Sequence, residues 1–518
     1  MAWSWKPLQR LKARRERAMV ARAVAAVAQP GTAPAHNVLA LSDIHLGHDL
    51  RAGANVQELR KRQDLDLQLA GLLDHYRERR RGGLPWRLVL NGDILDFVAI
   101  SLRPAPGEHV AFTLTQEDLA YGLAAEEAKT VWKLSKIFQR HEPAMDALAR
   151  FVEAGNTVVV VRGNHDAELA FEAVQRTFRE LLADRVHALP GPGRDAFTAR
   201  IDFANWFYFE PGQLYVEHGH LYDEWCTTDD VLGTKGTGDL ELPLSSQVIR
   251  YFINVVSSGG QTLDGTDDWG FVDYLRFGLR LGNPLAIASL YASMVWRLLK
   301  RPLKASLRFG RRAVAAAGVA LVAGVDPDAV HFQRLRAHLA DIAGDAGERD
   351  TRALMRLLKR PAGGSLFNVL RLFYIDQMML VALGAAGASA IALVHLPLFH
   401  RLLAWAVLGT TFALTSVGLA SMRRVDAHPK LLEAAHRVAR LFKVRYVVMG
   451  HSHRAVTETL EGGARYFNLG AWTGASKTEL GQVGMPHLVI ADGEARLCRW
   501  GAGVLTPQSR PAGSLVTA

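Results

Sequence analysis

The chain has 518 residues, about three times the length of a typical domain, so two or more structural units are expected. Hydrophobic residues make up 49% of it and charged residues 22%, which excludes a disordered chain and allows a sizeable core. Its two cysteines, Cys226 and Cys498, exclude a disulfide framework and a cysteine-rich zinc site, and they suit a reducing compartment.

The net charge of +10 is concentrated in two stretches of the chain. Residues 1–36 hold seven basic residues and one acidic residue, and residues 274–325 hold nine basic residues and no acidic one. The remaining residues are therefore net negative. This distribution disfavours a nucleic-acid-binding protein covered in positive charge, and it favours local docking on an anionic surface such as a membrane with anionic lipids.

Residues 1–36 form the first expected segment, a basic amphipathic one. An Ala-, Arg- and Leu-rich stretch follows Pro7 and ends near Pro30, which predicts a helix. Arg22 interrupts its small apolar run, so the segment does not have the pattern of a signal peptide. Two interpretations stay open: a helix lying on a membrane surface, and a solvated helical extension.

Residues 37–224 and 426–500 alternate short apolar runs with helical periodicity, which predicts an α/β fold. Helices are expected over Leu59–Arg80, Glu126–Ala154 and Glu168–Leu182. Strands are expected at Val38–Leu41, Arg87–Leu90, Thr157–Val161, Leu214–Val216, Tyr446–Met449, Ala464–Asn468, His487–Ala491 and Ala495–Trp500. The Gly-, Pro- and Ser-containing residues 501–518 are expected to be a flexible tail.

Residues 225–425 lack this alternation and are expected to form a large all-α insertion. Gln377–Phe399 and Leu402–Met422 contain no Asp, Glu, Lys or Arg, and each is long enough to cross a bilayer core of roughly 30 Å. We expect a membrane hairpin over 377–422, with its turn at Pro397 and His400-Arg401. Arginines at its outer ends (Arg371, Arg423 and Arg424) predict that the catalytic part faces the cytoplasm.

Two features of this insertion have alternative interpretations. The apolar pair could instead be two helices buried inside a soluble protein. Gly384 and Ala388 form a small-xxx-small pair that lets two helices approach closely. The basic stretch Arg297–Arg312, with leucines among its cations, suits either a helix at the headgroup level of a membrane or a solvated basic face.

Residues with metal-binding side chains follow five of the expected strands. Because the carboxyl ends of parallel strands meet at one edge of a sheet, these residues are expected to converge. The motifs are Asp43-Ile44-His45, Gly92-Asp93-Ile94-Leu95-Asp96, Gly163-Asn164-His165-Asp166, His218-Gly219-His220 and Gly450-His451-Ser452-His453. Carboxylate, imidazole and amide oxygen without thiolate suit two divalent metal ions, above all Mn²⁺, with Zn²⁺ or Fe as alternatives. Two such cations need a bridging anion, and Asp93 can provide it.

This ordered set of motifs resembles the calcineurin-like metallophosphoesterase family over about residues 37–224 and 426–500. The resemblance implies a four-layer α/β/β/α sandwich of two mixed sheets. It also implies that a hydroxide shared by the two metals attacks phosphorus in line with the leaving oxygen. By position, it assigns Asp43, His45 and His453 to the first metal, Asn164, His218 and His451 to the second, and Asp93 to the bridge.

The resemblance also implies roles for residues beside the metals. His165 would stabilise the phosphoryl oxygens or protonate the leaving group, and Asp96 would orient His165. His220 and Arg162 are candidate substrate contacts, with a plain turn residue and an ordinary ion pair as their alternatives. His48 is a weaker substrate candidate that could simply be a surface histidine, and Asp166 is expected to brace its turn.

The opening motif and the helical insertion are similar to those of UDP-2,3-diacylglucosamine pyrophosphatases, which hydrolyse a lipid-linked diphosphate at the cytoplasmic membrane face. This chain is longer, its insertion is larger, and His165 stands where those enzymes typically have Arg. We therefore expect a membrane-associated phosphoester hydrolase acting on a phosphorylated lipid or small molecule. The alternatives are a phosphatase or phosphodiesterase of soluble substrates such as nucleotides, with the insertion only as membrane anchor, and a catalytically silent membrane scaffold.

Overall fold

A computed structural model describes residues 36–51, 56–186, 191–233, 240, 242–257, 289–299, 327–343, 348–359, 361, 371, 374–421, 426–472, 484–501 and 504–507. The N-terminal segment 1–36 apart from His36, and the basic stretch from residue 300 to 312, lie outside these residues. The described residues fall into two compact units. One lies within 1–265, 327–359 and 427–518, and the other within 266–326 and 360–426.

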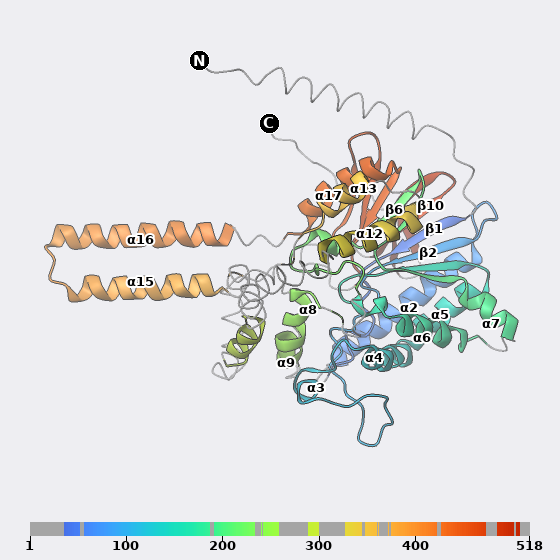
Figure 1. Ribbon diagram of the computed structural model, residues 1–518, viewed down its shortest axis with the longest axis horizontal. Coiled ribbons are helices and arrows are strands. Elements are labelled where there is room, and N and C mark those ends of the chain that lie inside the picture. Colours follow the sequence, from blue (N-terminus) through green and yellow to red (C-terminus); the bar gives the residue numbers. More distant parts are fainter. Residues whose placement is uncertain are drawn as a thin grey trace, which may run out of the picture. The chain divides into compact units, whose positions relative to one another are not determined.

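The first unit is mixed α/β (Figure 1), and one of its two sheets is mixed and has seven strands. Its order is β12-β11-β10-β1-β2-β3-β4, in which β1 to β4 are parallel neighbours and β10 to β12 are antiparallel. Its strands are β1 (Asn37–Leu41), β2 (Trp86–Asn91), β3 (Thr157–Val161), β4 (Ile201–Ala204), β10 (Met485–Ala491), β11 (Glu494–Gly501) and β12 (Val504–Pro507). The strand β12 lies within the stretch expected to be a tail, so that expectation is wrong for residues 504–507.

A second sheet of the same unit has five strands in the order β5-β6-β7-β9-β8. The central strands β6, β7 and β9 are parallel, and β5 and β8 pair antiparallel at the edges. Its strands are β5 (Phe207–Glu210), β6 (Leu214–Glu217), β7 (Tyr446–Met449), β8 (Ala455–Thr459) and β9 (Arg465–Leu469). The chain thus enters this sheet before residue 225 and completes it after residue 426.

Alternating side chains of each strand go to two different cores, because successive residues of a strand point to opposite faces. Val38 and Ala40 of β1 share a buried cluster with Val216 of β6 and Val448 of β7, so this core joins the two sheets. Leu39 and Leu41 belong to a second cluster that also includes residues of the helices.

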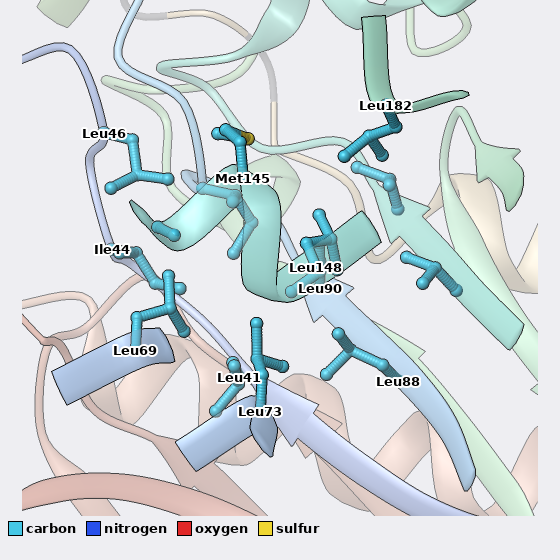
Figure 2. Packing of buried hydrophobic residues seen from close by; sticks show 14 of the residues in the cluster. Leu41, Ile44, Leu46, Leu69, Leu73, Leu88, Leu90, Met145, Leu148 and Leu182 are labelled. Carbon is cyan, nitrogen blue, oxygen red and sulfur yellow. The ribbon is translucent and has the colours of Figure 1, made fainter. Parts of the chain in front are cut away.

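Leucines and Met145 interdigitate in this second cluster (Figure 2). Its helical residues come mainly from α2 (Val56–Glu78), α4 (Glu127–Arg140), α5 (Glu142–Glu153) and α6 (Glu172–Ala183), and two short helical segments add Leu169 and Phe197. The single helix expected over 126–154 is broken at His141, because Pro143 occupies the first turn of α5 and cannot continue a preceding helix. Shorter helices on this unit are α3 (Gln116–Tyr121), η1 (Ala167–Ala170) and α7 (Gly191–Thr198).

A third cluster combines residues of the five-stranded sheet with α17 (His428–Phe442), α12 (Pro327–Ala343) and α13 (Glu348–Met355). Leu335 and Leu354 are fully buried in it. The segments η2 (His220–Tyr222), α8 (Leu244–Val248), η3 (Ile249–Ile253) and α9 (Asn254–Ser257) belong to the same unit. Asn254 anchors the last of these by donating to the carbonyl oxygen of Val98 at 2.9 Å. Parts of the expected insertion therefore belong to the core of the α/β unit.

The second unit contains two antiparallel helices, α15 (Ile375–Leu393) and α16 (Leu398–Ser421), which lie side by side in Figure 1. Small residues allow their contact: a Cβ added to Gly384 would lie 3.0 Å from Phe412, and one added to Gly387 would lie 3.1 Å from Leu408. The turn spans residues 394–397, so the expected turn at His400-Arg401 is wrong, and both residues belong to the first turn of α16.

Both helices are long and apolar enough to cross a membrane. In each helix, no residue of the apolar stretch is buried inside the structure. Leu383, Leu398, Leu414 and Val417 each expose 68% or more of their surface. This agrees with the expected apolar hairpin by length and composition, and it differs from the alternative of a helical pair buried in a soluble core.

Because the core lies under the helices, alanine substitutions at two leucines of α2 should lower the free energy of unfolding by very different amounts. Leu72 is fully buried, whereas Leu67 is 57% exposed. We expect Leu72→Ala to lower the free energy of unfolding by about 2–5 kcal/mol, because it removes buried methyl groups and leaves a cavity. Leu67→Ala should change it by less than about 0.5 kcal/mol. Urea unfolding of the purified protein followed by tryptophan fluorescence measures both, and equal losses would contradict the packing described.

Candidate metal centre

The loops after β1, β2, β3, β6 and β7 meet at one place on the first unit. β1, β2 and β3 are adjacent parallel strands of one sheet, and β6 and β7 are adjacent parallel strands of the other. Two hydrogen bonds tie the loops together. The backbone N–H of His165 donates to Asp93 Oδ1 at 2.8 Å, and that of His451 donates to Asp43 Oδ2 at 3.2 Å. The motifs that are far apart in the sequence are thus brought together, as expected.

The first group of potential ligands is Asp43, His45 and His453. One ligand atom from each lies within 4.8 Å of the others, and His453 Nε2 is 3.2 Å from Asp43 Oδ1. A second group, Asp43, Asp93 and His218, meets the same criterion, with His218 Nε2 3.2 Å from Asp93 Oδ2. The two groups share Asp43, so the five side chains form one continuous centre.

Several of these atoms are buried but have no hydrogen-bond partner. They are Asp43 Oδ1, His45 Nε2, Asn164 Oδ1 and His218 Nε2, of which Asp43 Oδ1 and His218 Nε2 face another ligand atom at 3.2 Å without forming a hydrogen bond. Burying a polar atom without a partner costs free energy, so such atoms are rare and require an explanation. All four can donate a lone pair to a metal, and all belong to residues that the sequence predicts as ligands. The donor set therefore fits divalent cations that accept oxygen and imidazole nitrogen.

In two of the candidate ligand histidines, the other ring nitrogen contacts a polar group of the protein. His45 Nδ1 lies 3.4 Å from Asp96 Oδ2, and His218 Nδ1 donates to the carbonyl oxygen of Asn91 at 3.0 Å. A partner on Nδ1 fixes the ring orientation and leaves Nε2 for a metal, as is usual for metal-binding histidines.

Negative charge is concentrated in this centre. Burial alone would raise the pKa of Asp93, but His218 and His165 outweigh it and hold that pKa well below its usual value. Burial alone would lower the pKa of His218, but Asp93 and Asp43 raise it to about 9. Asp93 thus stays ionised and His218 attracts a proton. A divalent cation would compete for the same lone pairs and displace that proton.

The backbone at this centre is strained. Asp43, His45, Asp93, His451 and His453 have φ values between 52° and 65°, in the left-handed region that non-glycine residues rarely adopt. Each costs about 1–3 kcal/mol, and such strain clusters at functional sites.

Neighbouring glycines allow the loops to approach each other. A Cβ on Gly163 would lie 2.2 Å from Asp93 Oδ1, and one on Gly450 would lie 2.0 Å from Ser42 Oγ. The Ser42 hydroxyl in turn donates to Asp43 Oδ2 at 2.5 Å. Any larger residue at these two glycines would push a ligand aspartate or its partner out of place.

Asp96 contacts histidines from two loops. His165 Nδ1 lies 3.1 Å from its Oδ1, and His48 Nδ1 lies 3.0 Å from its Oδ2. The carboxylate is almost fully buried, whereas the side chains of His165, His48 and His453 are 19%, 21% and 35% exposed. These three imidazoles therefore mark the side of the centre that solvent reaches. His48 is held by Asp96 and is not a plain surface histidine.

The remaining predicted residues are also placed near the centre. His220 is buried with its ring centroid 5.5 Å from that of His218, and its Nδ1 has no partner. Arg162 is buried and donates to the carbonyl oxygen of Val231, with no carboxylate partner among the described residues. Asp166 braces its turn as expected, accepting from the backbone N–H groups of Gly163 at 2.6 Å and Ile94 at 2.9 Å.

Two buried carboxylates near the centre are absent from the sequence-based predictions. Glu217, directly before His218, accepts hydrogen bonds from Trp206, Tyr215 and Tyr222 at 2.6–3.0 Å. Asp223 lies 3.3 Å from His451 Nε2. Glu217 could have been found from the sequence, because it is a charged residue at the end of an apolar strand, directly before a predicted ligand. Nothing in the local sequence distinguishes Asp223 from its neighbour Glu224.

No protein-family model and no curated protein matches this chain.

The geometry predicts that Asp93 is essential for metal binding. Asp93→Asn removes a buried charge whose carboxylate lies within reach of both His45 and His218, so we expect Mn²⁺ binding to the chelator-treated protein to weaken by at least about tenfold in isothermal titration. Asp202→Asn, on an exposed position of β4, is the matched control and should bind as the unchanged protein does. Equal affinity of the two variants would contradict the proposed centre.

Proposed function

We propose that this protein is a membrane-associated phosphoester hydrolase that depends on two divalent metal ions, as the resemblance to calcineurin-like metallophosphoesterases implies. The observation that carries the proposal is the convergence of buried, unpartnered ligand atoms from Asp43, His45, Asn164 and His218 at the ends of parallel strands. The arrangement of clusters also supports the family's layering: helices, the seven-stranded sheet, the five-stranded sheet, and helices again.

The residues divide into two ligand sets with one shared carboxylate. Asp43, His45 and His453 would hold the first cation, Asn164, His218 and His451 the second, and Asp93 both. Two cations, Mn²⁺ or alternatively Zn²⁺ or Fe, would place positive charge against the phosphoryl oxygens and make water acidic enough to react near neutral pH.

His165 is the residue proposed to handle a proton. Its Nδ1 faces Asp96 at 3.1 Å, and its side chain is 19% exposed on the open side of the centre. Burial alone would lower the pKa of His165, but Asp96 and Asp93 raise it to about 10, so the imidazole carries its proton at neutral pH. A protonated imidazole with one nitrogen fixed by a carboxylate can donate from the other to a leaving oxygen or to a phosphoryl oxygen.

We propose that three further residues, near His165 and Asp96 or near the second ligand set, contact the substrate. His48 shares Asp96 with His165 and faces the open side, and His220 and Arg162 are buried beside the second ligand set. The guanidinium of Arg162 has no carboxylate partner among the described residues, which suits an anionic group of a phosphorylated substrate.

The apolar hairpin supports a location at the cytoplasmic membrane. At 1.5 Å per residue, the 19 residues of α15 span about 28 Å, close to the thickness of a bilayer core. Arginines at the outer ends of the hairpin favour the cytoplasmic side for the α/β unit. A membrane location favours a lipid-linked phosphate or diphosphate as substrate. Hydrolysis of soluble nucleotides by an anchored enzyme is the alternative.

His165→Gln tests the proposed chemistry. Loss of the proton donor should lower kcat for a phosphodiester with an alkoxide leaving group, assayed with Mn²⁺, by about 10²–10⁴-fold, because general acid catalysis contributes that much when the leaving oxygen must be protonated. The number of Mn²⁺ ions bound should stay the same, since His165 is not a proposed ligand. His109→Gln, an exposed histidine, is the control. A metal-loaded protein without turnover on any phosphoester would favour the silent scaffold.

Leu383→Lys with Leu414→Lys tests the membrane location. Each lysine placed near the centre of a spanning helix costs about 2.5–3.5 kcal/mol, so the double variant should leave the membrane fraction on carbonate washing. The unchanged protein and the matching double alanine variant should stay in the pellet. Release of the unchanged protein would contradict an embedded hairpin.

The same double variant separates the two substrate classes. Under the lipid proposal, it should lose turnover of a lipid diphosphate in vesicles and keep turnover of bis-p-nitrophenyl phosphate. Nucleotide turnover at an undiminished rate, with no lipid turnover by either form, would favour the soluble-substrate alternative.

A further inference from the structure

We propose that Asp223 is a positioning residue that orients His451 toward the second metal. This inference rests on the proposed function in taking His451 as a metal ligand. Asp223 directly follows η2, five residues after His218, and none of the five motifs contains it.

Asp223 is held in place by contacts on both carboxylate oxygens. It is 4% exposed, and its Oδ2 lies 3.3 Å from His451 Nε2. Its Oδ1 lies 3.3 Å from Lys430 Nζ of α17 and accepts a hydrogen bond from the backbone N–H of Trp225 at 3.3 Å. A buried carboxylate with one oxygen fixed by an ammonium group and an N–H presents its other oxygen to the imidazole in a defined direction.

This contact determines which nitrogen of His451 can bind a metal. A carboxylate accepts a hydrogen bond and cannot donate one, so Nε2 carries the proton and Nδ1 keeps the lone pair. Asp96 acts on His45 from the opposite nitrogen, because there Nδ1 faces the carboxylate and Nε2 is unpartnered. Each proposed metal thus has one imidazole ligand backed by a buried aspartate.

A different role for Asp223, as ligand of a third cation, fits the contacts less well. Single ligand atoms of Asp223, Cys226 and His451 do lie within 4.8 Å of one another. However, the ammonium group of Lys430 already compensates the charge of Asp223 at 3.3 Å, and it would repel a cation at the same carboxylate. The geometry therefore favours orientation of His451 over a third metal site.

Titration of Mn²⁺ into the full-length, chelator-treated protein tests this inference, followed by electron paramagnetic resonance. We expect the unchanged protein to bind two Mn²⁺ and to show the signal of a spin-coupled pair. Asp223→Ala should bind the second Mn²⁺ about 10–100-fold more weakly, with the first unaffected, and show the signal of a single Mn²⁺ at intermediate metal concentrations. Asp223→Asn, whose amide oxygen can still accept from Nε2, should restore part of the affinity.

Glu433→Gln is the matched control, because Glu433 lies on α17 with a 60% exposed side chain and should bind Mn²⁺ normally. If Asp223→Ala bound two Mn²⁺ with unchanged affinity, this inference would be wrong and the proposed function would still stand. Equal weakening of both sites, without rescue by Asp223→Asn, would overturn it in favour of a general structural role. A third Mn²⁺ lost in Asp223→Ala would replace it with a third metal site. If the unchanged protein bound no Mn²⁺, the proposed function would fail as well.

Discussion

Loops from both sheets of this protein meet at one buried carboxylate, Asp93, and the rest of the centre depends on that contact. One of its oxygens accepts the backbone N–H of His165 from the loop after β3, and the other faces His218 from the loop after β6. One side chain therefore joins three loops and both sheets. The small size of Gly163 makes this approach feasible, since any Cβ there would collide with the carboxylate.

The surrounding fold stabilises an arrangement that is locally unfavourable. Left-handed backbone at five candidate ligand residues, repulsion between carboxylates, and buried polar atoms without a hydrogen bond all raise the free energy of the folded chain. The strands that lead into these loops are packed in apolar clusters on both of their faces. This packing holds the loops in conformations that would be unfavourable in isolation. A metal ion would relieve much of this cost, because it provides the missing partners and offsets the negative charge.

The two units of the chain differ in where they place their apolar side chains. The α/β unit buries its apolar residues and aligns polar ones at strand ends. The hairpin of α15 and α16 exposes apolar side chains around most of its surface and uses small residues only where its helices touch. Segments α12 and α13 belong to the first unit although they lie between the two halves of the α/β sequence. The long insertion is therefore divided between the two units and does not form one separate domain.

The sequence by itself determined the strands that carry the motifs, the ligand candidates and the apolar hairpin. Buried central strands are continuous apolar runs, and their ends are marked by polar residues and glycines, as with Thr157–Val161 and Asn164. The edge strands β4, β5, β8 and β12 escaped prediction because short strands with one neighbour carry polar residues and little periodicity. The break at His141 had a local signal, Pro143, which the strong helical periodicity on either side outweighed.

Only the tertiary structure decided which side chains contact the candidate ligands. Asp96 serves three histidines because the loop after β2 lies between the loops after β1 and β3, an order set by strand pairing. Asp223 meets His451 across 228 residues of sequence, and Lys430 contacts Asp223 from α17, a helix that packs on the five-stranded sheet. Contacts of this kind depend on the position of whole elements, and no local pattern of residue types encodes them.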